Sequence, residues 1–159
     1  MPRPKGTQAP IQQSVHVDCP IDDAFRLFTE AFGDWWPLAV YSITGDEAET
    51  CVIEPWVGGR VFERTRSGAE RDWGSVSGWD PPERLRLTWD PAGVGDGSQT
   101  VDVEFSADAD GTRVSIIHTG WEAPGVAVCS LQAEYAELWP ALLEQFFSKF
   151  AAEQMALTC

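Results

Sequence analysis

One of the two histidines in this chain stands where a β-strand would turn its side chain inward. His118 lies two positions after Ile116 and four after Val114, in a run of alternating apolar residues. Side chains two apart on a strand share a face, so the imidazole is expected beside an apolar interior. There it could contact a bound molecule, act as a general acid or base, or be a hydrogen-bonded core residue. His16 is out of phase with its apolar neighbours and is expected to face solvent.

Charged residues in the first half of the chain offer a second source of chemistry. Glu63 and Arg64 are adjacent in a β-prone run, so one is expected outside while the other supplies a charge or hydrogen bond to the interior. We find no Ser-His-Asp arrangement and no paired carboxylates at a spacing typical of nucleophilic or glycosidic catalysis. We therefore predict no catalytic residue. A cyclase or hydrolase that uses His118 with Glu63 or Arg64 stays an open alternative.

Metal and cofactor sites are not predicted. The four cysteines are far apart and form no C-x-x-C pair, which argues against a zinc or dithiol site and for free thiols. The acidic residues of the 102–110 run alternate along a strand, which indicates a solvated face and not a calcium loop. The cysteines are Cys19, Cys51, Cys129 and Cys159, and the acidic residues are Asp102, Glu104, Asp108 and Asp110.

Aromatic residues are the most distinctive feature, with eight tryptophans, eight phenylalanines and two tyrosines. Aromatic rings supply large apolar area with few rotors, which suits either a ligand pocket or simple core packing. Two adjacent tryptophans precede Pro37, which disfavours a helical conformation for the residue before it, so they stand on a loop or a short helical turn. The predicted ligand-binding residues are Trp35, Trp36, Trp73, Trp89, His118 and Tyr135.

The elements that must position these residues follow from periodicity. A short strand from Ile11 leads into a helix that begins near Pro20 and ends near Gly33. Alternating residues and turn signals, among them Gly58-Gly59, Pro81-Pro82 and Asp110-Gly111, then indicate a meander of antiparallel strands. These strands are predicted near residues 49–54, 60–66, 71–79, 83–90, 99–107 and 111–119.

A long helix is predicted from about residue 126 to about Met155. Because proline removes a backbone hydrogen bond, we expect either a kink at Trp139-Pro140 or two helical segments with Pro140 early in the second. A sheet that packs on one helix must curl, so we predict an α+β fold in which a curved antiparallel sheet of six or seven strands wraps around the C-terminal helix. Residues 1–10 are expected to be a flexible tail and residues 11–159 one domain. The apolar stripe of the helix comprises Leu131, Tyr135, Leu138, Leu142, Phe146 and Phe150.

The charge of the chain bears on its partners. It has 11 basic and 25 acidic residues, a formal net charge of -14, which disfavours nucleic acid and anionic lipid surfaces. No apolar run is long enough to span a membrane or to act as a secretion signal, so membrane insertion is not expected and a cytoplasmic location is. Two further possibilities stay open: that the acidic surface attracts a cationic protein or ligand, and that the protein forms a homodimer.

Several short motifs resemble those of a known family. In order along the chain they are residues 54–63 (EPWVGGRVFE), 74–76 (GSV), 79–85 (WDPPERL), 87–89 (LTW), 111–114 (GTRV) and 118–121 (HTGW). Together they are similar to bacterial relatives of the activator of the heat-shock-protein ATPase, the AHSA-like family within the START-like, or SRPBCC, superfamily. The resemblance covers roughly residues 11–155 and implies a helix-grip fold with a cavity. It implies no single chemistry, because the superfamily includes ligand carriers, cyclases, hydrolases, resistance proteins and chaperone regulators.

The leading hypothesis is non-catalytic binding of a small hydrophobic or aromatic molecule in a cavity between the sheet and the C-terminal helix. The cavity is expected where the helix diverges from the Trp35-Trp36 segment, since a sheet curled around one helix leaves a wedge there. The alternatives are an enzyme that uses the same cavity and a regulator that binds a chaperone or another protein.

Overall fold

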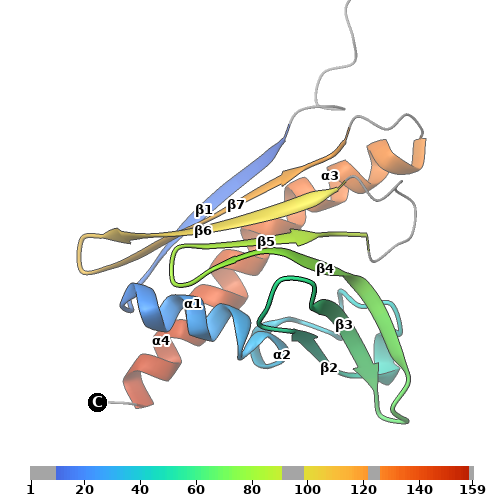
Figure 1. Ribbon diagram of the computed structural model, residues 1–159, viewed down its shortest axis with the longest axis horizontal. Helices are drawn as coiled ribbons and strands as arrows, with labels where there is room; N and C mark the ends of the chain where they lie inside the picture. Colours follow the sequence, from blue (N-terminus) through green and yellow to red (C-terminus); the bar gives the residue numbers. More distant parts are fainter. Residues whose placement is uncertain (1–9, 91–98, 122–125, 158–159) are drawn as a thin grey trace, which may run out of the picture.

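The computed structural model describes residues 10–90, 99–121 and 126–157, and the side chains from residue 132 onward in the last of these ranges. Seven strands form one antiparallel sheet in the order β1-β7-β6-β5-β4-β3-β2 (Figure 1). The strands are β1 (Ile11–Val17), β2 (Ala48–Ile53), β3 (Arg60–Thr65), β4 (Glu70–Asp80), β5 (Arg84–Thr88), β6 (Thr100–Asp108) and β7 (Gly111–Thr119). Their ends differ from the predicted ones by two residues or fewer.

The helical segments flank this sheet. The expected N-terminal helix is divided: α1 ends four residues before Gly33, and a short turn of helix carries the first of the paired tryptophans. The segments are α1 (Ile21–Thr29), α2 (Phe32–Trp35), η1 (Gly45–Glu47), α3 (Val126–Ala141), the π-helical segment η2 (Leu142–Phe147) and α4 (Ser148–Leu157). No described helix is both long and apolar enough to cross a membrane.

The last three of these segments form one continuous helical run that crosses one face of the sheet (Figure 1). The alternating apolar residues of β5, β6 and β7 are buried, as are Leu138 and Leu142 on the helix itself. The architecture is therefore the expected α+β helix-grip fold, with the core between the curled sheet and the helical run. The buried sheet residues are Leu85, Leu87, Val101, Val103, Val114 and Ile116.

The sheet curls where its register shifts. Irregularities interrupt the pairing of β2 with β3, of β3 with β4 and of β4 with β5. An extra residue in one strand increases the local twist and bends that strand. The long strand β4 thus turns the β2–β3 hairpin out of the plane of the other strands (Figure 1).

The helical run changes register just after Pro140. Instead of a simple kink at Trp139-Pro140, the chain forms the π-helical segment η2, which begins at Leu142. A π-helical turn contains more residues than an α-helical turn, so the side chains that follow it are rotated about the helix axis and a different set faces the sheet. The predicted stripe therefore fails beyond Leu142: Phe146 and Phe150 are only half-buried, and the fully buried positions are Leu143, Phe147 and Ala151.

One further expectation needs correction. Asp102 was expected on a solvated face, but it is 9% exposed because Arg84 and Arg86 cover it and donate hydrogen bonds of 3.0 and 2.7 Å to its Oδ1.

The hairpin between β6 and β7 forms at Asp110-Gly111 as expected. The pairing of the two strands extends to Asp108 and Gly111, and Ala109 in the turn is left-handed, with a φ of 55°.

Candidate functional site

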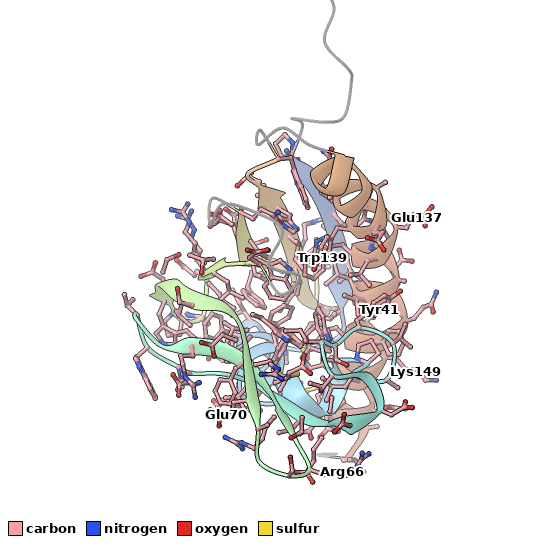
Figure 2. All side chains as sticks on the ribbon, turned by 90° about the vertical axis from the view of Figure 1, so that its right-hand side faces the viewer. Tyr41, Arg66, Glu70, Glu137, Trp139 and Lys149 are labelled. Carbon is pink, nitrogen blue, oxygen red and sulfur yellow. The ribbon has the colours of Figure 1, made fainter. Side chains whose placement is uncertain are left out.

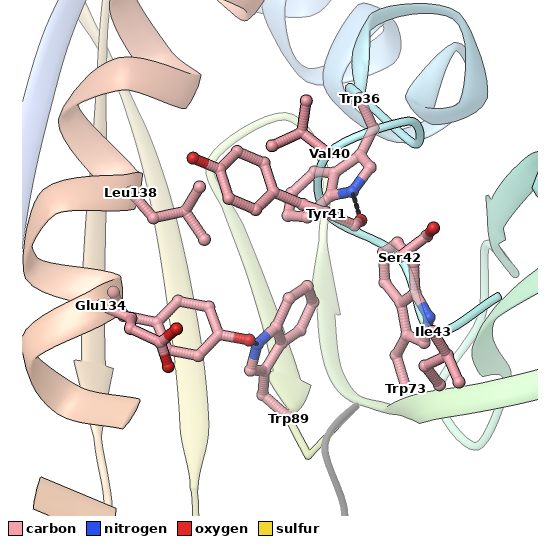
Figure 3. A pocket seen from close by; sticks show the side chains of 10 residues that line it. Trp36, Val40, Tyr41, Ser42, Ile43, Trp73, Trp89, Glu134 and Leu138 are labelled. Carbon is pink, nitrogen blue, oxygen red and sulfur yellow. Dashed lines mark hydrogen bonds between the residues drawn. The ribbon is translucent and has the colours of Figure 1, made fainter. Parts of the chain in front are cut away.

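A cavity of about 350 Å³ lies between α3, strand β4, the residue after β5 and the loop that follows α2 (Figure 3). It occupies the wedge expected between the C-terminal helix and the tryptophan pair. Its volume falls in the range of small-molecule pockets. The cavity is lined by Trp36, Val40, Tyr41, Ser42, Ile43, Trp73, Trp89, Glu134, Tyr135 and Leu138.

The floor of the cavity is formed by two tryptophans from neighbouring strands. The rings of Trp73 and Trp89 lie 5.7 Å apart at a steep angle, and the backbone N–H of Asp90 donates a 2.7 Å hydrogen bond to the carbonyl of Trp73. The strands approach closely here because Gly74 has no side chain. A Cβ at Gly74 would lie 1.9 Å from the carbonyl oxygen of Thr88. A small residue at this point therefore brings the two indoles together.

A loop closes one side of the cavity. Trp36 directly follows the short helix α2. Its indole Nε1–H donates a 2.7 Å hydrogen bond to the carbonyl of Tyr41, which folds the loop back on the tryptophan (Figure 3). Val40 and Ile43 are 67% and 43% exposed although both are large and apolar. They form an apolar rim at the mouth of the cavity.

The buried carboxylate of Glu63 fastens this loop to the sheet. It accepts hydrogen bonds from the backbone N–H groups of Ile43 (2.6 Å) and Thr44 (2.9 Å), from the Thr44 hydroxyl and from the Trp73 indole (2.7 Å). Burial alone would raise the pKa of Glu63, but these four donors lower it below its usual range. Arg64 faces outward and pairs with Glu70, as the alternation of the strand predicts for one member of the pair.

Tyr135 contributes a hydroxyl group to the cavity wall from α3. Its hydroxyl oxygen accepts a 3.0 Å hydrogen bond from the Trp89 indole. Burial raises the pKa of Tyr135 to about 12, the Trp89 hydrogen bond acts in the opposite direction, and the carboxylates of Glu134 and Asp90 raise it further. The phenol is therefore neutral at physiological pH and can donate its own hydrogen.

His118 is buried one layer behind the cavity wall. Its Nδ1 accepts a 3.1 Å hydrogen bond from the Trp139 indole, which can only donate, so the ring proton of the neutral imidazole is on Nε2 and is donated to Gln99 Oε1 at 3.0 Å. Burial lowers its pKa to about 3. The ring packs 5.0 Å from the ring of Tyr135, which does line the cavity. Figure 2 shows Trp139 directed inward from α3.

The six predicted site residues thus separate into two groups. Trp36, Trp73, Trp89 and Tyr135 line the cavity, whereas Trp35 and His118 do not. Trp35 is packed among aromatic rings, 4.9 Å from Phe28 and 5.1 Å from Phe147, and its indole donates to the Phe28 carbonyl. The ring of its neighbour Trp36 lies 5.8 Å away and lines the cavity.

Six lining residues were not among the predicted site residues. The helical stripe already pointed Leu138 inward, and the position next to Tyr135 could have suggested Glu134. The remaining four belong to a loop without periodicity, so nothing in the sequence indicates which way their side chains point. They are Val40, Tyr41, Ser42 and Ile43. Within the described ranges, no group of three or more His, Cys, Asp or Glu side chains is placed to hold a metal ion.

Comparisons with known proteins agree with this fold. Residues 18–149 match the family model described as Activator of Hsp90 ATPase homolog 1-like protein. The chain belongs to this family. The match confirms the resemblance seen in the short motifs and, with the solved structures below, the place of the chain among START-like proteins. No curated protein matches the chain.

Solved structures similar to this AHSA1-like chain include two at more than a quarter identity. One is the solution structure of CalC, a self-sacrificing resistance protein from Micromonospora echinospora, with 27% identity, a TM-score of 0.69, and coverage of 93% of this chain and 97% of that chain. Another is Txn09, an anthrahydroquino-γ-pyrone synthase, with 28% identity, a TM-score of 0.55, and coverage of 82% and 87%. A protein of Nitrosomonas europaea, at 14% identity and a TM-score of 0.65, covers 97% of this chain and 99% of its own and supports the fold.

Proposed function

We propose that the protein binds a small hydrophobic or aromatic molecule in the cavity beside α3, without transforming it. The observation that carries this proposal is the cavity of about 350 Å³ whose ten lining residues include three tryptophans, two tyrosines and three aliphatic side chains. Rings held by their own hydrogen bonds form a preorganised wall, so little ordering cost remains for a flat molecule that stacks on them.

The relatives support an aromatic ligand. The synthase at 28% identity is named for an anthrahydroquino-γ-pyrone, a fused-ring aromatic compound, and shares this fold. Three of the rings that line the cavity, those of Trp36, Trp73 and Trp89, lie 5.2 to 5.9 Å from one another at inclined angles. Such an arrangement leaves ring faces and edges for contact with a flat guest.

The alternative hypothesis of an enzyme has less support, because the residues considered for catalysis are already engaged in hydrogen bonds. Both ring nitrogens of His118 are engaged in hydrogen bonds behind the wall, and both oxygens of Glu63 accept hydrogen bonds from the loop and Trp73. Neither group has a free atom directed at the cavity, so the pair considered for catalysis serves to hold the walls.

Binding of a neutral fused-ring probe, anthracene-9-methanol, tests the proposal. Calorimetric titration and quenching of tryptophan emission should both saturate with one molecule bound per chain. Leu138→Trp should abolish binding, because the added indole fills the cavity that Leu138 faces. Leu157→Trp, on an exposed position at the end of α4, is the matched control and should bind as the wild type does.

Absence of saturable binding, or equal binding by Leu138→Trp and the wild type, would show that the cavity is not the ligand site. Native mass spectrometry of freshly purified protein provides a second readout, since a tightly held molecule would add a discrete mass.

A further inference from the structure

We propose that the cavity selects an aromatic ligand that carries a cationic amine over neutral and anionic ligands of the same shape. This inference rests on the proposed binding function and names the chemical class of the ligand. It is carried by two independent features of the cavity, the sign of its charge and the chemistry of its walls.

The charge facing the cavity is negative. Glu134 is the charged side chain among the described lining residues, and Figure 3 shows it on α3 at the edge of the cavity. Asp90 follows Trp89, and together with Glu134 it disfavours ionisation of the Tyr135 hydroxyl, so both carboxylates act on the atoms of the wall. A carboxylate or phosphate on a ligand would be repelled here, and an ammonium group attracted.

The sequence segments that contain the loop wall and the helix wall are acidic as a whole. Residues 36–49 and 126–148, which include the loop wall and the helix wall, contain six acidic residues and neither lysine nor arginine. They are Asp46, Glu47, Glu49, Glu134, Glu137 and Glu144.

Several arginines are instead engaged elsewhere. Arg60 and Arg64 form ion pairs with Glu70, and Arg84 and Arg86 with Asp102, on strands whose opposite face is the core. These pairs leave the acidic field at the cavity without a compensating arginine from β3 or β5.

The walls also favour a cation. Ammonium groups bind over the faces of tryptophan and tyrosine rings because the ring quadrupole is negative there. Trp36, Trp73, Trp89 and Tyr135 surround the cavity, with Glu134 at its edge. Aromatic faces together with a nearby carboxylate are the arrangement by which proteins bind amines, and a hydrophobic ring system would fill the remaining volume.

Three matched probes test this inference by calorimetry at neutral pH: anthracene-9-methylamine, anthracene-9-methanol and anthracene-9-carboxylic acid. The amine should bind about 3- to 10-fold more tightly than the alcohol, and the acid should bind most weakly. Glu134→Gln should bring the amine's affinity close to that of the alcohol measured on the same variant. Glu137→Gln removes the same charge from the outer side of α3 (Figure 2) and should retain most of the preference for the amine.

Each outcome decides between the proposals. Equal affinities of the wild type for amine and alcohol would overturn the cation preference and leave the binding function standing. An undiminished preference in Glu134→Gln, or an equal loss in Glu137→Gln, would overturn the role of Glu134. Failure of all three probes to bind would overturn the binding function and this inference with it.

Discussion

At the scale of single residues, neighbours decide the protonation of His118. Its Nδ1 faces an indole N–H, and the ring is fully buried between Trp121, Tyr135 and Trp139. A second proton would have to be placed on Nδ1, against a group that can only donate. The imidazole is therefore a neutral structural element that orients the rings on the inner side of the cavity wall.

This arrangement predicts a pH dependence. The pKa of His118 falls from 6.5 in the unfolded chain to about 3 in the folded protein. Between these two pH values the unfolded chain binds more protons than the folded protein does. Its contribution to stability is complete above pH 6.5 and is lost as the pH falls toward 3, with a slope of at most about 1.4 kcal/mol per pH unit. Urea unfolding of the wild type at a series of pH values should show this loss, and His118→Gln should show a shallower slope. Identical slopes would contradict the assignment.

Gly74 is a second residue-scale determinant. Gly74→Ala should destabilise the protein by about 2 kcal/mol or more, since the new methyl would meet the Thr88 carbonyl at 1.9 Å and push β4 from β5. Gly78→Ala is the matched control on the same strand, where the nearest atom would be the Arg86 Cβ at 3.1 Å, and should cost less. Thermal unfolding of both variants measures the difference, and equal costs would contradict the close approach at Gly74.

At the scale of elements, the cavity depends on a loop held by one buried carboxylate. Glu63→Gln should cost about 1–3 kcal/mol, because an amide nitrogen would face the N–H donors of Ile43 or Thr44. The amides of these two residues should exchange hydrogen faster, and binding of the neutral probe should weaken. Glu70→Gln, on the outer side of the sheet, should change stability by no more than about 0.5 kcal/mol. An unchanged exchange rate in Glu63→Gln would contradict the anchoring role.

The pH dependence of this anchor has a defined sign. The pKa of Glu63 is lowered by its donors, so its contribution is present above the ordinary value of 4.5 and is lost as the pH falls below it. His118 loses its contribution to stability over a range that begins at about pH 6.5, whereas Glu63 loses its contribution only below its ordinary pKa. Between about pH 5 and 6.5 the effect of His118 can therefore be measured separately.

The π-helical segment is the second element with a testable consequence. Phe147 is fully buried and lies 5.2 Å from Phe28, whereas Phe146 is half-buried. Phe147→Ala should cost about 3–5 kcal/mol and Phe146→Ala distinctly less. Denaturant unfolding of the two variants compares them directly. A regular α-helix through this region would reverse the order, because Phe146 and not Phe147 continues the stripe of Leu138 and Leu142.

At the scale of the whole molecule, the formal charge of -14 acts on stability as well as on ligand choice. Self-repulsion among carboxylates destabilises the compact state, and salt screens it over about 10 Å or less. The outer ion pairs are exposed and contribute little. Raising the salt concentration should therefore raise the melting temperature, as measured by circular dichroism. A lower melting temperature would show that the ion pairs outweigh the repulsion.

Local patterns along the chain predicted the elements and their faces. Alternation in residues 83–119 placed Leu85, Val103 and Ile116 inside, and the motifs identified the family and hence the helix-grip fold. The aromatic count pointed to the cavity wall, and four of six proposed residues line it. These are local signals, since a strand period of two and a helix period of 3.6 are visible along the chain.

Which groups contact each inward side chain follows from the tertiary structure and not from the local sequence. Periodicity places His118 inside and the abundance of aromatic residues suggested Trp35, but neither signal shows that Tyr135 and Trp36 lie between these side chains and the cavity. The π-turn shifted the helix face to Phe147, and the loop from Val40 to Ile43 became a wall because Glu63, twenty residues away, holds it. Such contacts join segments distant along the chain, so no local pattern encodes them; they form only when the packed elements bring the partners together.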